Sequence, residues 1–302
     1  MKNANDFPVK STVSAEDAAR VKGLGFLRDK NTPDCFNGRV ITRNGKITAD
    51  ESIAIAEAAR RFGSGEVAMT SRLTVEIQKV PFNNIAPLCE FLAAHGLETG
   101  GTGPKVRPIV SCKGTTCVFG LIDTFALSRE IHERFYKGYH DVKLPHKFKI
   151  GVGGCPNNCV KPDLNDVGII GQRVVKVDYD KCRGCKKCAI EEACPIKAAK
   201  LSGDKITVDK EECNNCGRCV KKCPFGAFEE YTNGCRMYIG GRWGKKTARG
   251  IPLSKVFTDK EEVLEVLERA ICFFRDNGIP GERFADTIAR IGFENVEKAL
   301  LG

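Results

Sequence analysis

Twelve of the sixteen cysteines fall in four tight clusters between Cys112 and Cys223. A secreted disulfide scaffold would be shorter and would spread its cysteines along the chain. Clustered thiols in a chain of 302 residues are instead typical of metal sites. Thiolates bind iron only while they stay reduced. No apolar leader or membrane-spanning stretch is apparent in the sequence, so we expect a cytoplasmic protein.

Eight of these cysteines form two copies of one pattern. The copies read Cys182-x2-Cys185-x2-Cys188-x5-Cys194-Pro195 and Cys213-x2-Cys216-x2-Cys219-x3-Cys223-Pro224. Three cysteines on one tight turn can bind three irons of a cubane, and the fourth ligand then comes from the other copy. A zinc site would use two pairs of ligands without the cysteine–proline ending, so zinc is disfavoured. This segment resembles two-cluster ferredoxins and predicts two [4Fe–4S] clusters, on Cys182, Cys185, Cys188 and Cys223 and on Cys213, Cys216, Cys219 and Cys194.

The remaining four clustered cysteines follow a different pattern. They lie in Cys112-Lys113-Gly114-Thr115-Thr116-Cys117 and Gly153-Gly154-Cys155-Pro156-Asn157-Asn158-Cys159. These segments resemble the split cysteine signature of sulfite and nitrite reductases. In that family the two pairs bind a [4Fe–4S] cluster, and the last cysteine also ligates the iron of sirohaem. The resemblance implies that Cys159 is the shared ligand, although the first pair here has four intervening residues where the family usually has five.

Basic segments extend the resemblance over most of the chain. Lys147 and Lys149 resemble the family's Lys-x-Lys strand, Thr70 to Leu73 its Thr-x-Arg segment, and Arg39 its first arginine. Residues i and i+2 of a strand share one face, so the two lysines can converge on one small anion. The resemblance implies that one set of basic residues lies at the substrate: Arg39, Arg72, Lys147 and Lys149. The segment Gly240-Gly241-Arg242-Trp243-Gly244-Lys245 resembles the family's glycine-rich loop at the macrocycle. This implies that Arg242, Lys245 and Lys246 bind the carboxylates of sirohaem.

The function implied by the resemblance is six-electron reduction of sulfite to sulfide at one sirohaem coupled to a [4Fe–4S] cluster. The overall pattern is similar to the C-subunit family of anaerobic sulfite reductases, whose electrons come from iron–sulfur and flavin subunits that oxidise NADH. No G-x-G-x-x-G segment follows a strand here, so we expect a partner to supply electrons. A nitrite reductase remains an alternative, although that branch typically has asparagine where Lys149 stands. A haem-free electron carrier with three clusters is the second alternative.

The formal net charge of +10 would also suit nucleic acid. No five-residue basic run occurs, and no basic stripe is interleaved with aromatic residues. An anionic cofactor and a small anionic substrate account for the excess equally well, so we expect no nucleic-acid partner.

For the elements that position these residues, we expect an α+β fold. The resemblance implies a ferredoxin-like half-domain, a sirohaem and [4Fe–4S] domain, and an inserted ferredoxin module. We place the domains at 1–105, at 106–172 with 231–302, and at 173–230. Apolar periodicity predicts strands at 36–43, 66–79, 148–152, 167–170 and 174–177 and helices at 50–62, 83–95, 119–136 and 259–276. Asp50 is the expected cap of the first of these helices, and Gly63 its end.

Two further expectations concern assembly and the isolated cysteines. Lys149 precedes Cys155 by six residues, roughly 20 Å of extended chain. A sharp bend could bring both to one sirohaem, but a homodimer in which Lys147 and Lys149 serve the partner's cofactor is simpler. The four cysteines outside the clusters are expected to be small buried apolar residues: Cys35, Cys89, Cys235 and Cys272.

Overall fold

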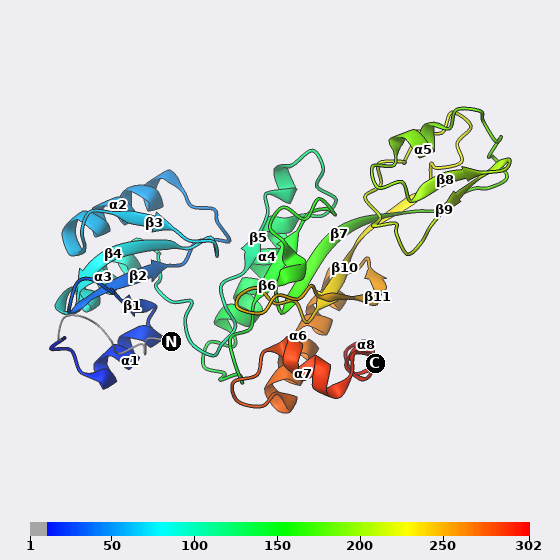
Figure 1. Ribbon diagram of the computed structural model, residues 1–302. Coiled ribbons are helices and arrows are strands. Elements are labelled where there is room, and N and C mark those ends of the chain that lie inside the picture. The colour runs from blue at the N-terminus through cyan, green and yellow to red at the C-terminus, as the bar shows by residue number, and fades with distance from the viewer. Residues whose placement is uncertain (1–10) are drawn as a thin grey trace. The chain divides into compact units, whose positions relative to one another are not determined.

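The computed structural model describes residues 11–302 and divides them into two compact units. The first contains residues up to 110 together with 128–149 and 274–283, and the second contains 111–127, 150–273 and 284–302. Both combine helices with β-sheet, so the predicted α+β class is confirmed (Figure 1). Among the described residues, no helix is both long and apolar enough to cross a bilayer.

The first unit is built on a four-stranded antiparallel sheet in the order β1-β2-β4-β3. Buried side chains of the sheet pack against those of the helices, with Phe36 and Ile77 from strands and Leu88 and Leu92 from a helix. The elements are α1 (Ala15–Gly23), β1 (Phe26–Arg28), β2 (Cys35–Val40), α2 (Ala49–Phe62), β3 (Val67–Met69), β4 (Val75–Pro81), η1 (Phe82–Asn84) and α3 (Ile85–Ala94).

Helix α2 matches its predicted range and ends at Gly63, but Thr48 caps it, not Asp50. The Thr48 hydroxyl accepts from the Glu51 N–H, while the Glu51 carboxylate accepts from the Thr48 N–H. This reciprocal pair satisfies two backbone donors at once, which a cap by Asp50 would not achieve.

The single strand expected over 66–79 is a hairpin of β3 and β4. Its turn is closed where the Thr70 N–H donates to the Thr74 carbonyl at 2.9 Å, with Leu73 in a left-handed conformation at φ 60°. Alternating apolar residues continue through the turn, so periodicity alone could not reveal it.

The second unit contains a mixed five-stranded sheet in the order β11-β10-β7-β6-β5, in which β6 and β7 are parallel. Its strands are β5 (Val110–Ser111), β6 (Ile150–Gly153), β7 (Val167–Val175), β10 (Tyr231–Ile239) and β11 (Ile251–Phe257). Its remaining elements are η2 (Gly114–Thr116), α4 (Thr124–Ile131), η4 (Pro162–Leu164), α6 (Lys260–Asn277), α7 (Phe284–Ile291) and α8 (Phe293–Leu301). Helices α4 and α6 continue into the first unit, and the π-helix η3 (His132–Lys137), which follows α4, belongs to the first unit.

Two predicted elements of this region change. The helix expected over 119–136 begins only at Thr124, because a turn that the Gly120 N–H closes on the Cys117 carbonyl comes first. The two strands expected at 167–170 and 174–177 are one strand, β7. Gly171 lies inside this strand and approaches Gly154 so closely that a Cβ would collide with the Gly154 carbonyl.

The cysteine-rich module is an insertion between β7 and β10. These strands pair antiparallel from Val167 with Ile239 to Val175 with Tyr231, so residues 176–230 leave and re-enter the sheet at one end (Figure 1). The module contains α5 (Ala189–Ala193) and the hairpin β8 (Ala199–Ser202) and β9 (Lys205–Val208). Its small apolar core packs against the cysteines, so metal ligation would add to a limited hydrophobic stabilisation.

Of the four cysteines outside the clusters, only Cys235 is buried. Cys35, Cys89 and Cys272 are half-buried, so the burial prediction is wrong for those three.

Candidate iron–sulfur redox site

The four cysteines of the split signature lie together at the end of β6. The Cys112 N–H donates to the Val152 carbonyl at 3.0 Å, which places Cys112 beside the strand that leads to Cys155. Burial raises the pKa of the Cys155 thiol, and the neighbouring thiols of Cys112, Cys159 and Cys117 raise it further. Four neighbouring cysteine thiols are the set of ligands that a [4Fe–4S] cluster requires.

Two glycines let the cysteine loops close on each other. A Cβ on Gly114 would come 2.8 Å from the Gly154 Cα, so the loops pack backbone against backbone. The Gly154 N–H then donates to the Cys112 Sγ with an N···S distance of 3.1 Å. Hydrogen bonds to sulfur are among the features that set the potential of iron–sulfur clusters.

Cys159 differs from its three companions because it is exposed, whereas they are half-buried. The preceding Asn158 adopts a left-handed φ of 56° and donates from Nδ2 to Asp163 Oδ1 at 2.7 Å. Arg249 donates to the other carboxylate oxygen of Asp163 at 2.6 Å. Asp163 is only 5% exposed, so a buried carboxylate fixes the loop that presents Cys159. Sequence reasoning assigned no role to Asn158, Asp163 or Arg249, and no motif connects Arg249 with Asp163, which lies 86 residues earlier.

The glycine-rich loop after β10 is closed by paired backbone hydrogen bonds between Arg242 and Ala248. Arg242 donates to both carboxylate oxygens of Asp286, at 2.8 and 2.9 Å. The structure therefore gives Arg242 a carboxylate partner within the chain, which the sequence did not indicate. Lys245 and Lys246 are exposed on the same loop. Binding of the cofactor by these three residues stays a prediction.

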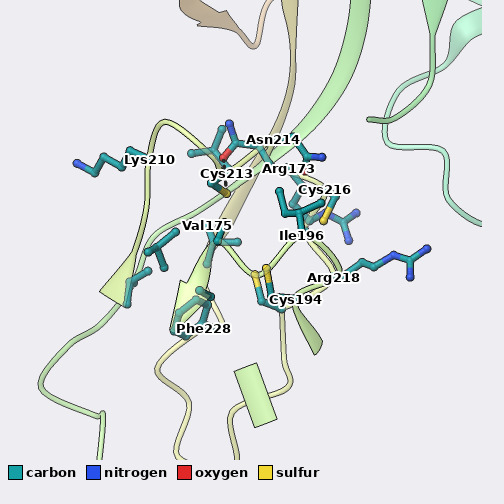
Figure 2. Close-up of a pocket in the computed structure, with 18 of the residues that line it drawn as sticks. Arg173, Val175, Cys194, Ile196, Lys210, Cys213, Asn214, Cys216, Arg218 and Phe228 are labelled. Carbon is teal, nitrogen blue, oxygen red and sulfur yellow. Dashed lines mark hydrogen bonds between the residues drawn. The ribbon is translucent and has the colours of Figure 1, made fainter. Parts of the chain in front are cut away.

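The module brings its eight cysteines together in two sets of four. One set lines a cavity of about 350 Å³ at the base of the module, and Figure 2 labels Cys194, Cys213 and Cys216 around it. Burial raises the pKa of the fourth member, Cys219, to about 11, with the nearby thiols contributing. The other set lines a smaller cavity of about 60 Å³ and consists of Cys182, Cys185, Cys188 and Cys223.

Each set takes three cysteines from one repeat and one from the other, which is the grouping expected for two cubanes. The Ile206 N–H donates to the Cys182 Sγ at 3.4 Å, as at the first centre. Within residues 11–302, no three metal-binding side chains form a site for a single ion. The thiols instead surround cavities, and ligation of clusters stays a prediction.

The predicted substrate residues all belong to the first unit, whereas all twelve cysteines belong to the second. Lys147 and Lys149 are half-buried on either side of the buried Phe148. The Phe148 N–H donates to Lys105 and its carbonyl accepts from Arg107, so this stretch is extended and the lysines share the face opposite Phe148.

The two predicted arginines have partners within the same unit. Arg39 donates to the Glu76 carboxylate at 3.1 Å across β2 and β4. Arg72 donates to the Pro108 carbonyl at 2.6 Å. Neither contact assigns a substrate role, which stays a prediction for both residues.

A cluster of arginines around Arg107 was not apparent from the sequence. Burial lowers the pKa of Arg107 to about 10, and the nearby positive charges of Arg39 and Arg283 lower it further. Arg283 is itself only 5% exposed. Arg39 is paired with Glu76, so this group brings three arginines together without leaving all of their charge uncompensated.

Comparison with known proteins assigns the chain to a family. The model of the "Nitrite and sulphite reductase 4Fe-4S domain" matches residues 102–301, and that of the "Nitrite/Sulfite reductase ferredoxin-like half domain" matches residues 28–95. The chain is 30% identical to the coenzyme F420-dependent sulfite reductase of Methanocaldococcus jannaschii, covering 91% of this chain but only 42% of that protein. It is 29% identical to the C subunit of the anaerobic sulfite reductase of Salmonella typhimurium, over 64% of this chain and 60% of that relative.

Solved structures share the fold at lower sequence identity. Dissimilatory sulfite reductase I superimposes with a TM-score of 0.69 at 21% identity, over 88% of this chain and 69% of that one. The NirA protein of Mycobacterium tuberculosis gives a TM-score of 0.67 at 16% identity, over 95% and 46%. From these matches and the predicted cysteine signature, the chain belongs to the nitrite and sulfite reductase family, with a ferredoxin-like half domain followed by a 4Fe-4S domain.

Proposed function

We propose that this chain is the catalytic subunit of a sulfite reductase that uses one sirohaem and three [4Fe–4S] clusters. The observation that carries the proposal is the group of Cys112, Cys117, Cys155 and Cys159. Three of these thiols are half-buried, as cluster ligands are, and the exposed Cys159 is accessible to a larger group such as a macrocycle. The chain spans less than half of its F420-dependent relative, so its activity and partners are proposed here on the residues themselves.

The cofactors would supply an iron that binds sulfur and a store of single electrons beside it. The chain would contribute Cys112, Cys117 and Cys155 as cluster ligands and Cys159 as the thiolate shared with the sirohaem. Asp163 would act through Asn158 to fix the Cys159 loop. Lys245 and Lys246, exposed and positively charged, would bind the carboxylates of the macrocycle.

The first unit would bind and protonate the substrate. Sulfite is a small anion, and loss of each oxygen requires protons and stabilisation of negative charge. Lys147 and Lys149 would donate protons from one face of their strand, while Arg39 and Arg72 fix the oxygens. Because Arg107 lies near both Arg39 and Arg283, these arginines would add to the positive potential that draws the anion in.

Nitrite is the second candidate substrate, since the family contains both kinds of enzyme. Lys149 supports sulfite because a second ammonium group better balances the larger negative charge of that anion. A haem-free electron carrier would need no residues that protonate a substrate, so the pair of lysines on one face argues against it.

The two clusters of the module would carry electrons from a partner that oxidises NADH or another soluble donor. Reduced thiolates in this number favour the cytoplasm. A homodimer, in which the lysines of one chain serve the sirohaem of its partner, would bring the two sets of residues together.

Turnover with a reduced dye tests the proposal. Purified anaerobically, the protein should show the absorption bands of sirohaem and produce sulfide from sulfite faster than ammonia from nitrite. Absence of sirohaem would favour the electron carrier, and faster turnover of nitrite would favour the other branch of the family.

A further inference from the structure

The two cluster loops of the ferredoxin module have different surroundings. The proximal loop is residues 213–219, and the distal loop is residues 182–188. In the distal loop, Cys182 accepts from Ile206 and Lys205, and Gly184 packs on Asp204, all inside the module. The proximal loop instead contacts β7 and a turn beside the split cysteine signature, as the following contacts show.

The first contact is a cation–π pair. The Arg218 guanidinium lies 5.0 Å from the centre of the Phe119 ring. Arg218 stands between Cys216 and Cys219, and Phe119 lies two residues after Cys117. One side-chain contact therefore connects a loop of the module directly with a loop of the catalytic centre.

The Phe119 side of this contact is fixed by its turn. The Gly120 N–H donates to the Cys117 carbonyl at 2.9 Å, and any Cβ on Gly120 would collide with the Gly114 carbonyl. The Leu121 N–H donates to the Gly154 carbonyl at 2.8 Å. The backbone of the turn is thus attached to both cysteine loops of the centre.

A second contact lies on β7. The Asn215 amide donates to Gln172 Oε1 at 3.0 Å, and the Arg173 N–H donates to the Asn215 carbonyl at 2.7 Å. Gln172 is 1% exposed, so this contact is inside the protein. The preceding residue of β7, Gly171, packs directly on the Gly154 carbonyl beside Cys155. Asn215, Gln172 and the Gly171–Gly154 contact form a second route between the same two loops.

We infer that electrons leave the module through the cluster of the proximal loop, and that Arg218 on Phe119 positions this cluster against the catalytic centre. The inference rests on the proposed function and specifies the order of its clusters. In each step one electron passes from the proximal cluster to the centre, so the former is oxidised and the latter reduced by one unit, with no bond broken. The distal cluster, on Cys182, Cys185, Cys188 and Cys223, then receives electrons from the external donor.

The internal repeat provides a matched control. Lys187 occupies in the distal loop the position that Arg218 occupies in the proximal loop, directly before the third cysteine. It pairs with Glu192 at 3.4 Å, and both are exposed. Replacing Lys187 or Arg218 by alanine removes the same charge at equivalent positions of the two clusters, but only the second change removes the contact with Phe119.

The experiment uses the holoenzyme, reduced with a limited amount of reduced methyl viologen and frozen at successive times for electron paramagnetic resonance. For Phe119→Leu and Arg218→Ala, we expect the arrival of electrons at the centre to slow about two- to fivefold. Loss of an exposed cation–π contact would reduce by this factor the fraction of molecules in which the proximal loop lies against the turn of Phe119. Lys187→Ala should retain the wild-type internal rate. Phe119→Trp and Arg218→Lys preserve the pair and should recover most of the rate. Iron content and unfolding midpoint should match the wild type in every variant.

Wild-type internal rates in both Phe119→Leu and Arg218→Ala would overturn the inference, as would an equal slowing by Lys187→Ala. The proposed function fails separately. If the wild-type protein produces no sulfide but the Arg218 and Phe119 variants still slow transfer between clusters, the order of clusters holds and the substrate assignment is wrong. If the wild-type protein produces sulfide normally but the Arg218 and Phe119 variants keep the wild-type internal rates, the proposed function holds and the proposed order of clusters is wrong.

Discussion

The side-chain amide of Asn158 donates a hydrogen bond to the carboxylate of Asp163 at 2.7 Å, directly before the exposed Cys159. The same carboxylate accepts from Arg249, and the Gly250 N–H donates to the Asp163 carbonyl at 2.7 Å. One buried acid thus connects the cysteine loop with the glycine-rich loop that follows β10.

Replacing Asp163 by alanine should loosen this connection. The half-buried amide of Asn158 would lose its acceptor, which costs up to about 1 to 3 kcal/mol in the free energy of unfolding. We also expect less iron at the centre of Cys112, Cys117, Cys155 and Cys159. Denaturant unfolding and iron analysis measure the two effects.

Arg249→Gln is the matched control, because the Arg249 side chain is 75% exposed. Its loss should cost less than about 1 kcal/mol. If Asp163→Ala were as stable as this control, Asp163 would not be the anchor of the loop.

The sequence predicted the sets of cysteines better than the contacts that position them. The spacing of the repeat predicts that Cys194 joins the cysteines of the second copy, because a cubane takes three ligands from one tight turn and the fourth from the other copy. The contact of Arg249 with Asp163 and the grouping of Arg39 and Arg283 near Arg107 join positions that no local pattern connects. The prediction of two strands in place of β7 was wrong for a related reason, because the packing of Gly171 on Gly154 inside this strand depends on a residue far away in the sequence.

Exchanging single ligands should distinguish the two clusters of the module. Cys194→Ser should remove the signal of the cluster on the proximal loop, although Cys194 lies in the first copy of the repeat. Cys223→Ser should remove the cluster on the distal loop instead. Iron content and electron paramagnetic resonance of the two variants report this. Loss of the distal signal in Cys194→Ser would show that each copy binds its own cluster.

Lys149→Asn should lower the turnover of sulfite far more than that of nitrite, because sulfite has more negative charge to stabilise. Steady-state assays on both substrates with the same dye measure the ratio. Lys143→Asn serves as a control, since this exposed lysine lies before the paired lysines. Equal losses on both substrates in Lys149→Asn would mean that another residue determines the preference.

Complementation tests whether the lysines act in their own chain or in a partner. The Lys149→Ala and Cys159→Ser variants should each be inactive alone. If sites are shared across a dimer, random mixing should restore up to about a quarter of full site activity. Mixed dimers without any recovery would place each site within a single chain.

The central claim is that Cys159 is the thiolate shared by a cluster and the sirohaem that reduces sulfite. The most direct measurement is sulfide production by Cys159→Ser, with the absorption spectrum and electron paramagnetic resonance recorded on the same sample. The account predicts that both clusters of the module remain, while sirohaem coupling and sulfide production are lost. Sulfide production at the wild-type rate by Cys159→Ser would contradict it.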